Sequence, residues 1–207
     1  MYNIGLIDDE YEQLKRYQKR FKSINKDIVI SSVEGCHTCE DVVQWILNNR
    51  IECLLVDYKL VNKFSFTGAE LINCINNKIG DLPCVILTSH KEDAEDEKLV
   101  LKLLIFDKEL IGKERTSSEL QEFIAMIIHA IEVFRKRFQL KKERYEALLQ
   151  KAQKDVLNFK EKEQLEDLFK ALRSYDIIDD VSVVSINKQV EDKVDNLINK
   201  IDELLNK

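Results

Sequence analysis

The chain has 207 residues and a formal net charge of −6, and 44% of its residues are hydrophobic. This hydrophobic content is enough for a buried core, which excludes a wholly disordered chain, and the length fits one ordinary domain with a smaller module attached. The acidic balance argues against a nucleic-acid-binding surface spread over the whole molecule.

Short apolar runs alternate with amphipathic stretches over residues 1–115. The apolar runs predict strands at 3–7, 28–33, 53–56, 84–87 and 103–106. The helical spacing of apolar residues predicts helices at 11–24, 38–47, 68–75 and 92–102, the second of them capped by Thr38. Alternating strands and helices indicate an α/β fold, with helices on both faces of a parallel sheet.

The pattern changes after Ser117, where apolar residues recur at steps of four and three: Leu120, Ile124, Ile127, Ile131, Phe134, Phe138, Tyr145 and Leu148. No glycine follows Gly112 and no proline follows Pro83. The spacing predicts a helix of about 35 residues with a heptad seam. The seam favours a dimeric coiled coil, with an intramolecular bundle as the alternative.

Two more helical patterns follow, at 165–172 and 190–204, and the segment 175–186 between them is interpreted as a loop with at most a short strand. These segments predict a first domain over residues 1–134 and a helical tail over residues 135–207, as a coiled coil or a small bundle. The tail shows no convincing helix-turn-helix signature, since such motifs usually carry a glycine turn. It is interpreted as a protein-interaction module.

No segment approaches the roughly 18 uninterrupted apolar residues that a membrane span requires, and no basic region followed by an apolar run marks a secretory signal. Most of the five cysteines lie in apolar runs, which indicates reduced thiols and a cytoplasmic protein. The motif Cys36-His37-Thr38-Cys39 lacks a second ligand pair nearby, so we expect no zinc site there.

Reactive side chains follow four of the predicted strands. Acids at 8–10 follow the first strand, Asp57 the third, Thr88 the fourth and Lys108 the fifth. Because ligands bind at the carboxyl ends of parallel strands, we expect these groups to share one edge of the sheet. Clustered carboxylates suit Mg²⁺, one of them can serve as a nucleophile, and the hydroxyl and ammonium can bind phosphoryl oxygens.

The sequence resembles the receiver domain of two-component response regulators, which are CheY-like proteins. The resemblance covers a little over half of the chain and rests on five pieces in the family's order and spacing: IGLIDDE (4–10), LLVDYKL (54–60), TGAEL (67–71), LPCVILTS (82–89) and DK (107–108). It implies a doubly wound (βα)₅ fold with strand order 2-1-3-4-5, whose last helix here runs on into the helical tail.

The resemblance also implies the roles of single residues. Asp57 would accept a phosphoryl group, Thr88 would hydrogen-bond it, and Lys108 would pair with one of its oxygens. Mg²⁺ would be held by Asp8, Asp9, Asp57 and the backbone carbonyl of Lys59. Small Ser89 would leave the site open, and Lys59 and His90 would tune the hydrolysis of the acyl phosphate.

Two positions depart from the family pattern. Ile105 stands where family members carry an aromatic switch residue, and neighbouring Phe106 should point to the other face of the strand. Glu109 replaces the proline that usually follows the lysine, and a non-proline cis bond costs about 3 kcal/mol. We therefore expect the way in which the site is coupled to the rest of the domain to differ from the family pattern. We expect the same of the loop at Lys108.

The predicted function is that of a response regulator, phosphorylated on Asp57 by a histidine kinase or phosphotransfer protein. It would act as a homodimer, or through a protein effector that contacts the tail. It would not be an enzyme, beyond Mg²⁺-dependent self-phosphorylation and dephosphorylation. One alternative is a scaffold whose activity does not depend on phosphorylation. The other is a transcriptional regulator that uses the basic stretch 135–144, which we interpret instead as a solvated helix face without nucleic-acid contact.

Overall fold

The computed structural model of the chain describes residues 1–60 and 64–173. The chain divides into two compact units, Met1–Leu140 and Lys141–Lys207. The sequence predicts the boundary between residues 134 and 135.

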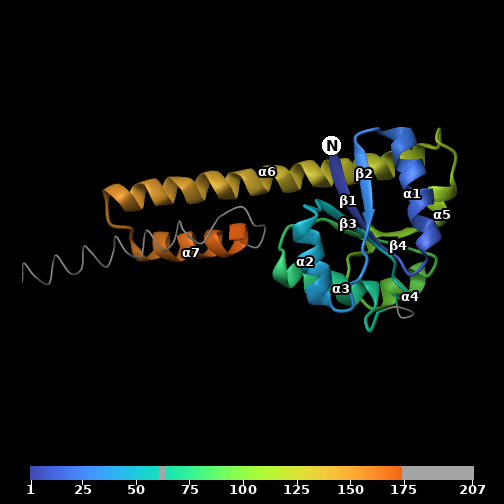
Figure 1. The fold of residues 1–207 in the computed structure, drawn as a ribbon, viewed down its shortest axis with the longest axis horizontal. Coiled ribbons are helices and arrows are strands. Elements are labelled where there is room, and N and C mark those ends of the chain that lie inside the picture. Colours follow the sequence, from blue (N-terminus) through green and yellow to red (C-terminus); the bar gives the residue numbers. More distant parts are fainter. Residues whose placement is uncertain (61–63, 174–207) are drawn as a thin grey trace, which may run out of the picture. The chain divides into compact units, whose positions relative to one another are not determined.

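The first unit contains a five-stranded sheet in which every strand pair is parallel, in the order β2-β1-β3-β4-β5 (Figure 1). The fold class and strand order predicted from the sequence are therefore confirmed. All residues of β3 and β4 are buried, as expected of strands covered on both faces. The strands are β1 (Tyr2–Ile7), β2 (Ile28–Ser32), β3 (Cys53–Val56), β4 (Cys84–Thr88) and β5 (Ile105–Asp107).

Helices follow the strands in alternation: α1 (Tyr11–Ile24), α2 (Cys39–Asn48), α3 (Gly68–Lys78), α4 (Lys91–Asp96) and the short α5 (Glu109–Gly112). Capping boxes fix the starts of α2 and α3, where Thr38 and Thr67 accept hydrogen bonds from the backbone N–H groups of Asp41 and Glu70. The starts of these two helices are thus set by local sequence.

Helix α4 is shorter than its polar sequence predicts. The expected helix over 92–102 ends at Asp96, because Lys98 adopts a left-handed backbone with φ of +56°. A 3-10 helix, η1 (Lys102–Leu104), then leads into β5. Along this segment Leu99, Leu101 and Leu103 are 44%, 66% and 68% exposed.

The longest helix is α6 (Ser118–Lys154), with 37 residues, as the sequence predicts. Its first turns belong to the core of the first unit, where the seam residues pack with α1 and the sheet: Leu120, Ile124, Ile127 and Ile131. Burying such a side chain contributes about 1.5–3 kcal/mol to folding. The expected dimeric coiled coil is therefore wrong for this stretch, because the seam is buried within its own chain.

The described part of the second unit contains the end of α6 and helix α7 (Phe159–Arg173). The rings of Tyr145 and Phe169 stack at 6.4 Å, and a reciprocal pair of hydrogen bonds between Asn158 and Glu161 caps α7. The seam beyond residue 140 thus also packs inside the chain. The helix predicted at 190–204 and the loop predicted at 175–186 lie outside the described residues.

A disulfide joins Cys39, the first residue of α2, to Cys74 of α3. The expectation of reduced thiols is therefore wrong for these two residues, because the packing of α2 beside α3 brings them together from positions 35 apart. The ion pair between Lys78 and Glu40 joins the same two helices. Cys36, Cys53 and Cys84 are free and buried.

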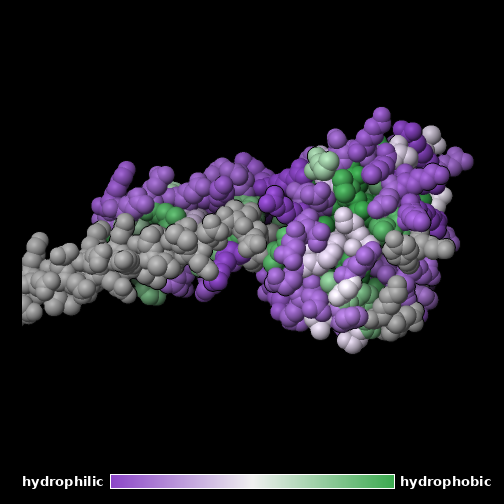
Figure 2. Space-filling view, in the orientation of Figure 1, coloured by the Kyte–Doolittle hydropathy of each residue, from purple (hydrophilic) through white to green (hydrophobic). Residues whose placement is uncertain are grey.

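Among residues 1–60 and 64–173, no helix is long and apolar enough to cross a membrane. Figure 2 shows mainly hydrophilic residues over the visible surface of this part of the chain. This agrees with the high charged fraction of the sequence, 34%.

Candidate functional site

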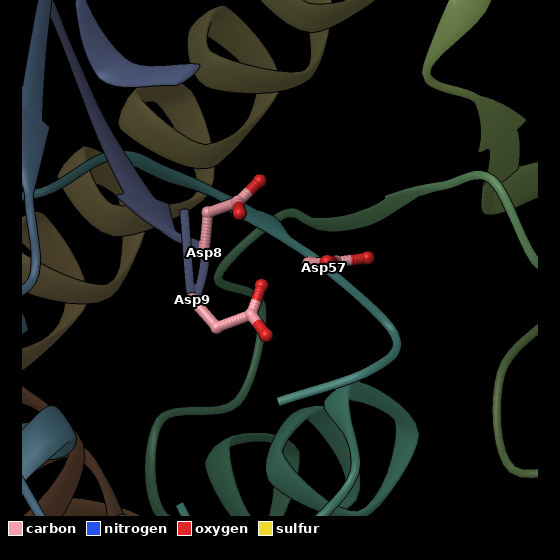
Figure 3. A group of neighbouring side chains, drawn as sticks. All are labelled: Asp8, Asp9 and Asp57. Carbon is pink, nitrogen blue, oxygen red and sulfur yellow. The ribbon is translucent and has the colours of Figure 1, made fainter. Parts of the chain in front are cut away.

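Three carboxylates gather at the carboxyl edge of the sheet (Figure 3). Asp8 and Asp9 follow β1, and Asp57 follows β3. Each offers one oxygen, and these oxygens all lie within 4.8 Å of one another. Because β1 and β3 are adjacent and parallel, their ends bring acids that are distant in sequence to one place. The structure thus brings together the acids that the sequence predicted.

Lys108 enters this cluster from the loop after β5. Its ammonium Nζ lies 2.6 Å from Asp57 Oδ2 and 2.9 Å from Asp8 Oδ2. Its backbone N–H donates to the carbonyl of Thr88 at 3.1 Å, which fixes the loop to the end of β4. Lys108 makes these contacts although every described peptide bond is trans, so replacement of the family's proline by Glu109 does not displace the lysine.

Burial dominates the electrostatics of the cluster. It raises the pKa of the Asp8 carboxyl, although the hydrogen bonds from the Glu10 backbone and Lys108 act in the opposite direction. For Lys108 burial is again the largest single effect and lowers the pKa. The hydrogen bonds and charges of Asp57 and Asp8 together outweigh it, and the pKa of Lys108 is raised. The lysine is therefore a fixed positive charge between two acids.

The donor set suits a hard divalent cation, because it consists of carboxylate oxygens. Asp8 Oδ2 is buried and lies 2.9 Å from the ammonium of Lys108. A carboxylate has about four lone-pair sites, so Asp8 can contact both the lysine and a cation. Lys59, whose carbonyl the sequence analysis added to this set, stands two residues after Asp57, with its ammonium 3.6 Å from Asp93.

The end of β4 supplies the hydroxyl. Thr88 is fully buried, and its Oγ1 accepts a hydrogen bond from the backbone N–H of His90 at 3.1 Å. Ser89 and His90 are exposed beside it, and His90 Nδ1 lies 3.8 Å from Asp93. Thr88 is therefore enclosed at the end of the strand next to β3, and Ser89 and His90 follow it at the surface.

Ile105 and Phe106 lie on opposite faces of β5, as predicted. Ile105 is 2% exposed and stands beside Ile86 of β4. Phe106 packs on Phe123 of α6, with ring centroids 4.8 Å apart. The rotating aromatic side chain of the family has no counterpart at position 105, and Phe106 is held in the core on the other side of the sheet.

Gly68 brings the start of α3 against the backbone of Asp57. A Cβ atom at this position would lie 2.2 Å from the carbonyl oxygen of Asp57, which is far inside van der Waals contact. The backbone N–H of Gly68 donates to the carbonyl of Tyr58 at 2.8 Å. Only glycine permits this approach, so Gly68 positions the backbone at Asp57.

Sequence reasoning missed one polar contact near the site. The hydroxyl of Tyr58 donates to Glu97 Oε1 at 2.9 Å, and that of Thr67 donates to Glu97 Oε2 at 3.3 Å. We call these three residues the Glu97 clamp. Burial, together with the hydrogen bond to Glu97, raises the pKa of Tyr58 to about 12. Glu97 has no motif around it, so only the fold reveals its partners.

The segment at Cys36 and His37 lines a cavity of about 330 Å³ that also borders Asp8. In the described part of the chain, the acids 8, 9 and 57 form the one group of carboxylates, histidines or cysteines close enough to hold a metal.

Comparisons with protein-family models and with curated proteins found no match. Among solved structures, the chain is similar to a response regulator receiver domain protein from Clostridium thermocellum, with 18% identity, a TM-score of 0.48 and coverage of 66% of this chain and 98% of that one. It is also similar to a sensor protein from Polaromonas sp. JS666, with 14% identity, a TM-score of 0.48 and coverage of 64% of this chain and 98% of that one. A third similar structure is that of RcsB dimers bound to two parallel DNAs, with 14% identity, a TM-score of 0.46 and coverage of 91% of this chain and 98% of that one.

Proposed function

We propose that this protein is a two-component response regulator that accepts a phosphoryl group on Asp57. The observation that carries the proposal is the position of the Lys108 ammonium, 2.6 Å from Asp57 and 2.9 Å from Asp8. A nucleophile, a fixed cation and two further acids at one edge of a parallel sheet form a phosphoryl-transfer site. The resemblance found in the sequence assigns the same roles to the same residues.

The donor is a phosphohistidine on a kinase or phosphotransfer protein. A carboxylate oxygen of Asp57 forms a bond to phosphorus while the bond from phosphorus to the histidine nitrogen breaks, and that nitrogen keeps the electron pair. Lys108 compensates the charge on the phosphoryl oxygens, and the Thr88 hydroxyl donates a hydrogen bond to one of them. Hydrolysis of the acyl phosphate returns Asp57 to the carboxylate, so the chain is a phosphoacceptor and not an enzyme acting on other substrates.

Mg²⁺ would be held by Asp8, Asp9, Asp57 and the carbonyl of Lys59, and would neutralise charge on the phosphoryl group during transfer. The three carboxylates, which each offer an oxygen within 4.8 Å of the others, support this assignment. Lys59, Ser89 and His90 stand at the rim, where they would set the access of water and thus the lifetime of the acyl phosphate.

The output is a protein–protein interaction of the helical tail or a change in self-association. Two-component signalling of this kind requires a partner kinase and a downstream protein effector, and a homodimer remains part of the proposal. Since the α6 seam is buried in its own chain, a dimer would use a different surface. Ile105, at the position of the family's switch aromatic, implies that the signal leaves the site by another route.

The alternative output is DNA binding through the basic stretch 135–144, which has less support than a protein–protein interaction. Arg135 is bonded to Glu52, Arg137 to Asp81 and Arg144 to Gln164, so these guanidinium groups are engaged within their own units. A mobility-shift assay over a range of salt concentrations tests this role directly, because phosphate contacts give a steep salt dependence.

The central test is treatment of the protein with acetyl phosphate and Mg²⁺, followed by intact-mass measurement. One added phosphoryl group is expected, and Asp57→Ala should abolish it. Asp27→Ala is the matched control, because Asp27 is an exposed acid just before β2, away from the cluster. Absence of an adduct with acetyl phosphate and with any phosphohistidine donor would overturn the proposal and favour the scaffold alternative.

A further inference from the structure

The residue that follows the acceptor contacts the end of α4. Tyr58 is 9% exposed, and its hydroxyl donates to Glu97, the first residue beyond α4. The second oxygen of the same carboxylate accepts from Thr67, the N-cap of α3. Hydrogen bonds to an ionised carboxylate are roughly twice as strong as neutral ones. One side chain therefore fastens both flanks of the connection between β3 and α3 to α4.

The next residue makes a second link to α4. Lys59 Nζ lies 3.6 Å from Asp93, in the first turn of α4, and both side chains are about half exposed. Exposed ion pairs of this kind contribute about 0–1 kcal/mol to stability, so Lys59 can leave Asp93 for another anion at little cost. The two residues that follow Asp57 thus hold α4 through contacts of unequal strength, one protected and one labile.

An exposed apolar segment follows Glu97 directly in the chain. Lys98 has a left-handed backbone that ends the helical path, and the exposed leucines 99, 101 and 103 follow before β5. By contrast, Ile105 is buried on the sheet and has no bulky ring to rotate. Among the described residues around the acceptor, the Glu97 clamp is a direct connection between Asp57 and an exposed segment.

We infer that Glu97 is a positioning residue, and that the Glu97 clamp couples the phosphorylation state of Asp57 to the exposed leucine segment 99–104. This inference rests on the proposed function of Asp57. A phosphoryl group adds up to two negative charges next to Lys59 and competes with Asp93 for its ammonium. Once that labile link is lost, the hydrogen bonds of Tyr58 and Thr67 to Glu97 still tie the chain after Asp57 to the end of α4.

The coupling is reciprocal, because two linked equilibria change each other by the same factor. If the state of Asp57 alters the segment 99–104, then breaking the clamp alters the affinity of the site for a phosphoryl analogue. The coupling can therefore be measured in the full chain both at Asp57 and at the segment after Glu97. Beryllium fluoride with Mg²⁺ serves as the probe at Asp57, and amide hydrogen exchange reports on residues 97–104.

The first arm compares Tyr58→Phe, which removes only the hydroxyl, with the unaltered chain. In the unaltered chain, beryllium fluoride with Mg²⁺ should change the exchange rates of residues 97–104. In Tyr58→Phe and in Glu97→Ala that change should be lost. The dissociation constant of beryllium fluoride should shift about five-fold or more in both variants.

The second arm separates positioning from general destabilisation. Thr67→Val removes the cap of α3 and the link to Glu97, whereas Thr38→Val removes the equivalent cap of α2, which has the same capping box and no such link. Loss of a cap costs about 1 kcal/mol in either helix. Only Thr67→Val should abolish the exchange response, and Thr67→Ser, which keeps the hydroxyl, should restore it.

The results separate the two proposals. If the unaltered chain binds beryllium fluoride and the variants keep both its affinity and the exchange response, the clamp inference fails and the role of Asp57 stands. An equal loss of response in Thr38→Val and Thr67→Val also overturns the inference. If the unaltered chain does not bind the analogue and gains no phosphoryl group from acetyl phosphate, both proposals fail.

Discussion

Lys108 holds Asp57 across an intervening strand: its Nζ lies 2.6 Å from Asp57 Oδ2, although β5 and β3 are separated by β4. The same ammonium lies 2.9 Å from Asp8. Two buried carboxylates this close to each other repel, and the shared cation offsets that repulsion. Lys108 is therefore the group that allows the acids to gather before any metal ion binds.

Replacing Lys108 by glutamine removes this charge and keeps a hydrogen-bond donor. We expect phosphorylation by acetyl phosphate to slow roughly 10²-fold, as when a single charge-stabilising donor is lost from a reactive site. The rate is measured by intact mass over time. The control is Lys113→Gln, because Lys113 is an exposed lysine paired with Glu119 outside the site. Equal rates in the two variants would contradict the role given to Lys108.

Asp8→Asn should stabilise the protein in the absence of Mg²⁺. Burial raises the pKa of Asp8, so the folded state disfavours its ionised form, and the substitution removes that charge. An increase of about 0.5–2 kcal/mol in the free energy of unfolding is expected, measured by urea denaturation at neutral pH. Added Mg²⁺ should stabilise the unaltered chain and leave Asp8→Asn unchanged. If Asp8→Asn is less stable than the unaltered chain, burial does not disfavour the ionised form of Asp8.

Magnesium binding should weaken on mild acidification. The pKa of Asp8 is higher in the folded than in the unfolded chain, so the stability that this group contributes is present below the unfolded value and is lost as pH rises through the folded value. The metal needs the ionised form. Calorimetric titrations with Mg²⁺ should therefore show affinity falling before the pH reaches about 4, the usual aspartate value. Constant affinity down to that pH would refute the prediction.

Gly68→Ala should disturb the acceptor, because the added Cβ would lie 2.2 Å from the Asp57 carbonyl oxygen. A loss of about 1–3 kcal/mol in unfolding free energy is expected, together with slower phosphorylation. Gly80→Ala is the matched control, because nothing lies within 4 Å of a Cβ at that position. If both alanine variants behave alike, the close approach at Gly68 is not what positions the acceptor.

The disulfide between Cys39 and Cys74 should be detectable in solution. Thiol titration of protein unfolded without reductant should find three free thiols among the five cysteines. Reduction should lower the unfolding free energy by about 2–4 kcal/mol, as expected when a loop of this length is opened. Cys39→Ser should lower it as much and become insensitive to reductant. A count of five thiols would show that the bond does not form in solution.

The residues at strand ends were predictable because their positions follow from local pattern. The apolar run 53–56 fixes where β3 ends and therefore places Asp57 at the edge of the sheet. Thr38 and Thr67 mark the starts of α2 and α3 through hydrogen bonds to residues only three positions further along the chain. Period and capping act over a few residues, so the sequence is sufficient to infer them.

Other features depend on packing between distant segments. Tyr58 meets Glu97 over 39 positions, and Cys39 meets Cys74 over 35. The polar run after residue 91 has helix-forming residues, yet the backbone at Lys98 turns to reach β5, so tertiary context overrides propensity there. The seam of α6 was visible in the sequence, but its partner could not be, because a heptad pattern fits an intramolecular core as well as a second chain.

The burial of α6 also affects how the protein is made. Synthesis proceeds from the N-terminus, so all five strands leave the ribosome before the helix that covers one face of their sheet. Phe106 and the part of that face that α1 does not cover stay open to water until Phe123 and Ile131 have emerged. A nascent chain that stops short of α6 would present an uncovered apolar surface, the kind of surface that chaperones bind and that drives aggregation.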